Sequence, residues 1–320
     1  MSKSIQYAIG VDLGGTFIKF GLVNSEGKIV KKTFLDSKAA EGPDKVIKQI
    51  KKGIKDLIEK SNYKINGIGI GAPGVISTKK GTVENPPNLP GWGKIHLGKI
   101  ISKECKLETF VENDANAAAI GEMIFGAGKK LNSFIMVTLG TGVGGGIIFE
   151  KKLFRGETGA AGEIGHLSID YKGDNCNCGS VGCIEAYLGN NYLINRVVKE
   201  YDSNKSSLVF SLIGNNFELL TPKVIADAAL QGDQFAIHII EKLGNQLGYA
   251  LASVANLMDI TSVIIGGGVS GFGEKLFNSV ETAMRDRVLK SLQTRIKVLP
   301  AKLSNDAGIK GASSLVFYRN

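Results

Sequence analysis

The chain has 320 residues, a length that predicts about two domains and a core large enough to fold unaided. Apolar residues make up 43% and charged residues 22% of the sequence, a balance that excludes a wholly disordered protein. The net charge of +9 could attract a polyanion, a membrane surface or phosphate-bearing ligands. Because the lysines are scattered in ones and twos, we favour a solvated basic surface and expect no nucleic-acid partner.

The expected location follows from what the sequence lacks and from its cysteines. No stretch approaches the roughly 18 apolar residues of a membrane span, and residues 1–4 lead straight into an expected strand rather than a signal sequence. We therefore expect a cytoplasmic protein with no membrane partner. Three of the four cysteines lie close together, at Cys176, Cys178 and Cys183, which in a reducing cytosol indicates metal ligands rather than disulfides.

The first third of the chain predicts a strand meander followed by alternating helices and strands. Strands are expected at 7–11, 17–23 and 28–30, with a glycine bend at residues 12–16 between the first two. The elements expected after them are a helix at 42–62, strands at 65–70 and 109–112, and an alanine-rich helix at 115–125.

The middle of the chain repeats the first pattern. Residues 134–149 again run as strand, glycine bend and strand, and Val137-Thr138-Leu139-Gly140 matches Val11-Asp12-Leu13-Gly14, which indicates an internal duplication. The elements expected beyond are helices at 187–199, 221–230, 235–258, 273–289 and 306–317, and strands at 262–265 and 296–299. Alternating strands and helices predict an α/β fold.

Glycine is enriched, at 42 residues, and its clusters lie beside apolar runs, which is typical of backbone that closely approaches a ligand. No Walker A motif is present. Residues 266–271 fit G-x-G-x-x-G, but the next strand lacks the acidic residue that a dinucleotide site requires. Residues 140–146 contain five glycines, more than a hairpin needs. We therefore expect two glycine hairpins whose backbone N–H groups bind phosphates, facing each other across a cleft.

These motifs together resemble the bacterial sugar kinases of the repressor/ORF/kinase (ROK) family. The resemblance rests on residues 12–16, Glu112 to Ala118, residues 139–147, Glu163 to His166 and Cys176 to Glu185, in the family's order along the whole chain. It implies a two-domain actin-like (ribonuclease H-like) sugar-kinase fold with a hinge cleft. The N-terminal domain would comprise 1–115 and 301–320, and the C-terminal domain, with a zinc segment, 116–300. The resemblance also implies ATP and Mg²⁺ as cosubstrates, a hexose substrate and a homodimer.

Asp114 supports two compatible interpretations. It precedes an alanine-rich helix, where Asp is a preferred N-cap. A carboxylate at a helix N-terminus is also favoured in its charged form, which suits a base that accepts a proton from a sugar hydroxyl. The resemblance assigns Asp114 as the catalytic base, with Glu112 expected to be structural.

The resemblance also assigns the remaining site residues. The implied sugar ligands are Gly74, Asn88, Asn113, Asp114, Glu163, His166 and Glu185. The implied nucleotide-binding residues are Asp12, Gly14, Gly15, Thr16, Gly140, Thr141, Gly142, Gly267 and Gly268. Asp12 is expected to bind a water ligand of Mg²⁺.

His166, Cys176, Cys178 and Cys183 form a Cys₃His set in one short segment. Four protein ligands leave no open position, so we expect a structural zinc rather than a catalytic one. With the metal on one ring nitrogen, the other nitrogen of His166 is expected to meet a sugar hydroxyl. Free thiols near a turn are the alternative.

The sequence therefore predicts an ATP-dependent hexose kinase, with glucose phosphorylated at its 6-hydroxyl as the first choice. Fructose, mannose and N-acetylhexosamines remain alternatives. A sugar-responsive ROK repressor without its DNA-binding domain is the alternative from another class. Its helix-turn-helix would be expected before the first strand, which here begins within ten residues of Met1. An actin-like scaffold would have no use for the carboxylates or the cysteines.

Overall fold

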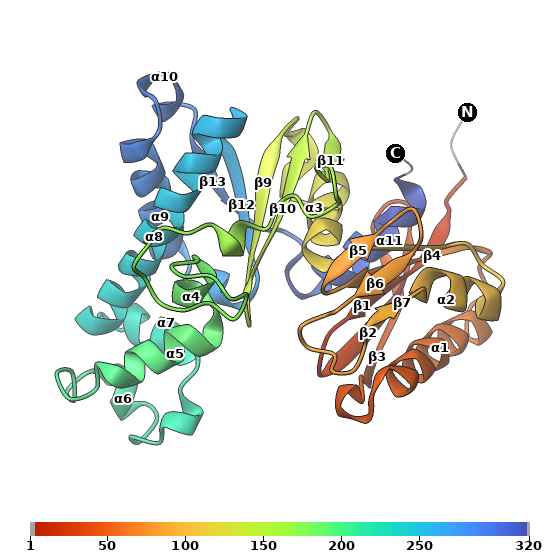
Figure 1. Cartoon of the computed structure of the whole chain (residues 1–320), viewed down its shortest axis with the longest axis horizontal. Coiled ribbons are helices and arrows are strands. Elements are labelled where there is room, and N and C mark those ends of the chain that lie inside the picture. Colours follow the sequence, from red (N-terminus) through yellow and green to blue (C-terminus); the bar gives the residue numbers. More distant parts are fainter. Residues whose placement is uncertain (1–3, 319–320) are drawn as a thin grey trace. The chain divides into compact units, whose positions relative to one another are not determined.

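The computed structural model describes residues 4–318, which form a mixed α/β protein (Figure 1). Its first sheet has the strand order β3-β2-β1-β4-β8. The strands are β1 Tyr7–Leu13, β2 Phe17–Asn24, β3 Ile29–Asp36, β4 Ile65–Ala72 and β8 Thr109–Asn113. Strands β1, β2 and β3 are antiparallel neighbours, whereas β4 and β8 run parallel to β1.

The second five-stranded sheet repeats this plan, with the order β11-β10-β9-β12-β13. Its strands are β9 Phe134–Leu139, β10 Val143–Phe149, β11 Lys152–Phe154, β12 Ser262–Gly266 and β13 Lys297–Pro300. As in the first sheet, the second and third strands along the chain, β10 and β11, are antiparallel. Strand β12 runs parallel to both β9 and β13. The shared order agrees with the internal duplication that the sequence indicates.

Helices fill the connections between strands. Their bounds are α1 Pro43–Glu59, α2 Leu97–Cys105, α3 Asp114–Phe125, α4 Glu185–Leu188, α5 Asn190–Lys199, α6 Leu208–Ser211, α7 Pro222–Leu230, α8 Gln234–Met258, α9 Glu274–Arg287, α10 Lys290–Gln293 and α11 Ala307–Phe317. The expected single helix at 187–199 is wrong, because Gly189 adopts an extended conformation and separates α4 from α5. A small sheet of β5 Val75–Ser77, β6 Thr82–Glu84 and β7 Lys94–Ile95 was not predicted.

The chain divides into two compact units. Unit 1 comprises Met1–Asn132, Gly146–Gly162 and Lys302–Asn320, and unit 2 comprises Ser133–Gly145 and Glu163–Ala301. Unit 1 includes α3 because this helix packs against α11. The domain boundaries expected at 115/116 and 300/301 remain a prediction.

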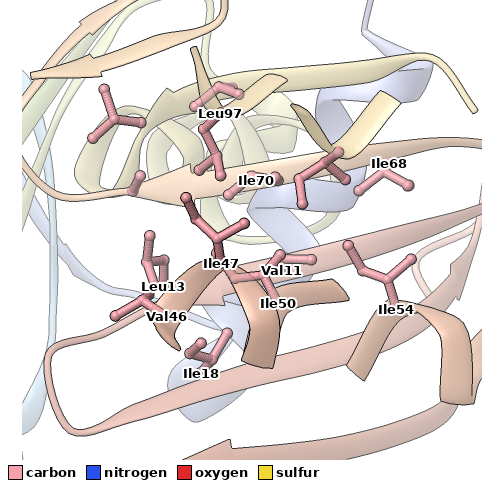
Figure 2. Packing of buried hydrophobic residues seen from close by; sticks show 14 of the residues in the cluster. Val11, Leu13, Ile18, Val46, Ile47, Ile50, Ile54, Ile68, Ile70 and Leu97 are labelled. Carbon is pink, nitrogen blue, oxygen red and sulfur yellow. The ribbon is translucent and has the colours of Figure 1, made fainter. Parts of the chain in front are cut away.

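Opposite faces of the first sheet carry α1 and α11. Side chains alternate along β1, so Val11 and Leu13 point towards the apolar stripe of α1, as Figure 2 shows. On the other face, α11 lies so close that a side chain at Gly10 or Gly69 would collide with its backbone. Glycine at these positions therefore brings the last helix of the chain directly onto the first sheet.

Helix α8 is the longest in the described structure and is apolar over much of its length. Even so, no helix within residues 4–318 is both long enough and apolar enough to span a membrane.

Candidate functional site

The first glycine hairpin joins β1 to β2 and carries a half-buried carboxylate, that of Asp12. Gly14 N donates to Phe17 O at 3.1 Å and closes the bend. Asp12, at the end of β1, pairs across the strands with Lys19, whose Nζ lies 3.5 Å from Asp12 Oδ2. Burial raises the pKa of the Asp12 carboxyl above its usual range, although the Lys19 charge lowers it. The hairpin thus combines backbone N–H donors with the Asp12 carboxylate, whose charge Lys19 partly compensates.

The start of α3 is capped by Asn113. Its Oδ1 accepts from Ala115 N at 3.0 Å and from Asn116 N at 3.2 Å. The interpretation of Asp114 as the N-cap is therefore wrong. Asp114 is the first helical residue, is exposed, and accepts from Ala115 N at 2.8 Å. Asn and Asp are equally good caps, and here the residue that ends β8 takes the position.

Two other predicted sugar ligands of unit 1 lie near these motifs. The Gly74 carbonyl accepts from Asn113 Nδ2 at 3.5 Å, so Gly74 adjoins the start of α3. The side chain of Asn88 lies against the first hairpin, because a Cβ at Gly15 would lie 2.9 Å from Asn88 Cβ. Unit 1 therefore brings Gly74, Asn113 and Asp114 together, and Asn88 next to the hairpin.

The second glycine hairpin joins β9 to β10 and is held by α4 and α5. Gly140 N donates to Gly142 O at 2.9 Å, and Asn190 N donates to Gly140 O at 3.0 Å. Val143 N donates to Glu185 Oε2 at 2.9 Å. Gly267 packs against the Leu139 backbone with a φ of 89°, so the two predicted nucleotide-binding segments of unit 2 are neighbours. Gly268 begins the next 3₁₀ turn.

The Cys₃His set converges in unit 2. One ligand atom from each of His166, Cys176, Cys178 and Cys183 lies within 4.8 Å of the others. Cys176 Sγ is 3.8 Å from His166 Nδ1, and the Sγ atoms of Cys178 and Cys183 are 3.7 Å apart. Bond lengths of about 2.3 Å to zinc sulfur ligands imply tetrahedral edges of about 3.8 Å, so the donor set fits zinc.

The pKa values of the three thiols in the cluster are shifted in different directions. Burial raises the pKa of the Cys176 thiol to about 12 and raises that of Cys183. A backbone hydrogen bond from Ser180 instead lowers the pKa of Cys178. Two of the three sulfur atoms therefore belong to buried side chains that gain from a cation when they ionise.

Of the predicted sugar ligands of unit 2, His166 belongs to this cluster, Glu185 contacts it and Glu163 adjoins His166. Glu163 and His166 are exposed at the two ends of one 3₁₀ turn, where His166 N donates to Glu163 O at 3.1 Å. Glu185 Oε1 lies 3.9 Å from Cys176 Sγ, so the same carboxylate contacts both the cluster and the second hairpin. Thr141 is exposed at the bend of that hairpin.

The family model described as the ROK family matches residues 8–318. The chain belongs to the ROK family. A glucokinase from Thermotoga maritima is 39% identical over 96% of this chain and 96% of its own. A xylose repressor from Caldicellulosiruptor bescii is 32% identical over 99% of this chain and 79% of its own.

A solved structure extends the ROK resemblance to the fold. The ROK family glucokinase from Streptomyces griseus, in complex with glucose and AMPPNP, is 34% identical over 97% of this chain and 98% of its own, with a TM-score of 0.85. The predicted α/β, actin-like sugar-kinase fold class is confirmed.

Sequence reasoning missed the surroundings of the catalytic candidate in this ROK protein. Glu112, expected only to be structural, is 2% exposed and accepts from Asn113 N and Asn116 Nδ2. Its other oxygen accepts from Arg155 Nε, a residue that no motif singles out. The position of Glu112 next to Asn113 and Asp114 is the one available signal, whereas Arg155 gives none because its partner lies 43 positions away.

Proposed function

We propose that this ROK protein is an ATP-dependent hexose kinase that converts glucose and ATP to glucose 6-phosphate and ADP. Whole-length identity to glucokinases, 39% for the Thermotoga maritima protein, carries the proposal. The related Streptomyces griseus enzyme, crystallised with glucose and AMPPNP, supports both substrates. In this proposal the first residues of α3 and the two glycine hairpins would supply the chemistry that the reaction needs.

Asp114 is proposed as the general base. It lies at the first position of α3, where the helix dipole favours a charged carboxylate. In the reaction its carboxylate would orient the sugar hydroxyl and take its proton as the hydroxyl oxygen bonds to the γ-phosphorus, while the bond from the γ-phosphorus to the bridging oxygen breaks and ADP leaves. Asn113 Oδ1 already caps α3, so we propose that Asn113 contacts the sugar through Nδ2. Gly74, Asn88, Glu163, His166 and Glu185 are proposed as the other hexose ligands.

The two glycine hairpins are proposed to bind the nucleotide phosphates through backbone N–H groups. Asp12, Gly14, Gly15 and Thr16 would act from unit 1, and Gly140, Thr141, Gly142, Gly267 and Gly268 from unit 2. Mg²⁺ would neutralise charge on the phosphates, and Asp12 would hold one of its water ligands.

His166, Cys176, Cys178 and Cys183 are proposed to bind a structural zinc, since their atoms match a tetrahedral Cys₃His set. Zinc would stabilise the loop that carries them and fix the His166 ring, leaving its second nitrogen for a sugar hydroxyl. A cytoplasmic location, where reducing conditions keep these thiols available, and a homodimer are part of the proposal.

A hexose panel with ATP, run on wild type and Asp114→Asn, tests the function. Wild type should phosphorylate glucose, and Asp114→Asn should lose about a hundredfold to ten-thousandfold in kcat, the usual contribution of a general base. Asp44→Asn is the matched control, because Asp44 is an exposed acid in the first turn of α1. Turnover of no sugar by wild type would falsify the kinase proposal. Near-normal turnover by Asp114→Asn would show that Asp114 is not the general base.

The xylose repressor relationship favours one alternative, a sugar-binding protein that does not transfer phosphate. Such a protein would bind a sugar without ATP-dependent turnover, so calorimetry on the same panel distinguishes it from a kinase. Preferential phosphorylation of fructose, mannose or an N-acetylhexosamine would support the kinase reaction but show that glucose is not the preferred substrate. We propose no nucleic-acid or membrane partner.

A further inference from the structure

Glu112 is a buried acid at the junction between β8 and α3. Its side chain is 3% exposed, yet both oxygens accept hydrogen bonds. Oε1 accepts from Asn113 N at 3.0 Å and from Asn116 Nδ2 at 3.3 Å. Oε2 accepts from Arg155 Nε at 3.0 Å. An acid buried this deeply is tolerated because these donors replace water.

Glu112 contacts residues on both sides of Asp114 in the sequence. Asn113 precedes Asp114 and has its N–H bound by Glu112. Asn116 follows two residues later and has its side chain bound by the same oxygen. Asn113 Oδ1 in turn binds the N–H groups of Ala115 and Asn116. One carboxylate therefore binds the Asn113 backbone before Asp114 and the Asn116 side chain after it.

Arg155 supplies the charge that keeps this carboxylate in place. It follows β11, in the segment Gly146–Gly162 that belongs to unit 1. Its side chain is 31% exposed, so the ion pair joins a half-buried cation to a buried anion. Such a pair adds little net stability, but the loss of one partner leaves an uncompensated charge.

We propose that Glu112 and Arg155 are positioning residues for Asp114, an inference that rests on the proposed function. The ion pair fixes the Glu112 carboxylate, and the carboxylate fixes the turn from β8 into α3 on which Asp114 stands. Transfer to a hydroxyl requires the base within hydrogen-bond reach of it. A displacement of about 1 Å can cost about a hundredfold in rate.

The variants Glu112→Gln and Arg155→Gln distinguish a role in positioning Asp114 from a role in stability alone. The amide that replaces the Glu112 carboxylate has one oxygen, so either Asn113 N or Arg155 Nε loses its acceptor. Arg155→Gln leaves the Glu112 charge without its cation. In the double variant, the amide at position 112 can donate to the side-chain carbonyl at position 155 while its own oxygen retains Asn113 N. We expect each single variant to lose about tenfold to a hundredfold in kcat, with the KM for ATP little changed. The KM for hexose should rise by a smaller factor than kcat falls, because Glu112 also holds the proposed hexose ligand Asn113. The double variant should recover part of the loss in kcat.

Glu281→Gln is the matched control in unit 2. Glu281 Oε1 pairs with Arg285 Nη2 at 2.7 Å, and its Oε2 accepts from Val298 N at 3.1 Å. This variant should lower the melting temperature without changing kcat. If Glu112→Gln and Arg155→Gln do the same, with wild-type kcat per folded molecule, the positioning role is overturned. Arg155→Gln alters the more exposed partner and so serves if Glu112→Gln does not fold.

Amide hydrogen exchange tests the same geometry without turnover. Exchange at Ala115 and Asn116 should be faster in both single variants and closer to wild type in the double variant. Unchanged exchange would contradict the inference. A wild type that phosphorylates no sugar would end the proposed function, whereas this measurement would still decide whether the ion pair orders the start of α3.

Discussion

The two glycine hairpins occupy equivalent places in the two sheets, between the first and second strands of each, but they are built differently. The β1–β2 hairpin carries the Asp12–Lys19 ion pair. At the matching positions the β9–β10 hairpin has Thr138 and Gly145. This second hairpin has no charge of its own and is held from outside by Glu185 and Asn190.

If both hairpins bind phosphate, as proposed, they are built for it in two different ways. The first hairpin has an internal ionisable pair that can act on a cation or a phosphate. The second offers backbone groups and the hydroxyls of Thr138 and Thr141 but no charge. Its shape depends on contacts with α4 and α5 and, through Glu185, on the Cys₃His loop. Substitutions should therefore affect chemistry in the first hairpin and shape in the second.

The largest contrast is expected between Asp12→Ala and Thr138→Ala. We expect about a hundredfold loss in kcat for Asp12→Ala, as for the removal of one transition-state stabiliser. Thr138→Ala should stay within about threefold of wild type, because it removes no charge. Steady-state kinetics with varied Mg²⁺ measures both, and equal losses would mean that the hairpins are functionally alike.

Metal removal should act on the second hairpin and not on the first. Chelation of the proposed zinc should release the loop that carries Cys176 and loosen Glu185, which contacts both Cys176 Sγ and Val143 N. We expect the melting temperature to fall by several degrees or more and the Val143 amide to exchange faster. The Gly14 amide, which donates to Phe17 O, should be unaffected. Equal changes at both amides would indicate global loosening.

Two neighbouring glycines give a smaller and sharper test. A Cβ at Gly142 would collide with Glu185 Oε2, whereas a Cβ at Gly140 meets nothing within 4 Å. Gly142→Ala should cost about 1 kcal/mol of stability, because the Glu185 carboxylate must move aside and lose its hydrogen bond from Val143 N. Gly140→Ala should leave the melting temperature unchanged. If Gly140→Ala weakens AMPPNP binding without lowering that temperature, the loss arises at the ligand.

The smallest effect concerns Asp12 and pH. Its folded pKa lies above the ordinary value of 3.8, so the folded protein binds this proton more tightly than the unfolded chain does. Stability therefore falls as pH rises through the window from 3.8 to the folded pKa. Above that window Asp12→Asn should raise the melting temperature by about 2 °C while lowering turnover. A fall in melting temperature would mean that Lys19 outweighs burial.

The elements that the sequence predicted best are those with strong local signals. Helix α8 was expected at 235–258 and spans Gln234–Met258. The start of α7 was also predicted, since Thr221 caps it and Pro222 follows. Strands β5 to β7 were missed because two or three residues show no periodicity.

The site shows the same dependence on locality. The Cys₃His set was predicted from spacing, and its atoms converge in the structure. The interpretation of Asp114 as the cap was wrong because Asn113, next to it, has equal propensity and the sequence gives no local preference between them. The Glu112–Arg155 pair depends on how β11 returns to unit 1, which no short stretch of sequence specifies.

The close packing of α11 on the first sheet has a consequence for how the protein is made. Ala307–Phe317 covers the face of that sheet opposite α1 and approaches Gly10 and Gly69 directly. A ribosome synthesises all of unit 2 before these residues emerge. The first sheet therefore receives α11 only after all of unit 2 has been made, although the strands of that sheet are made first.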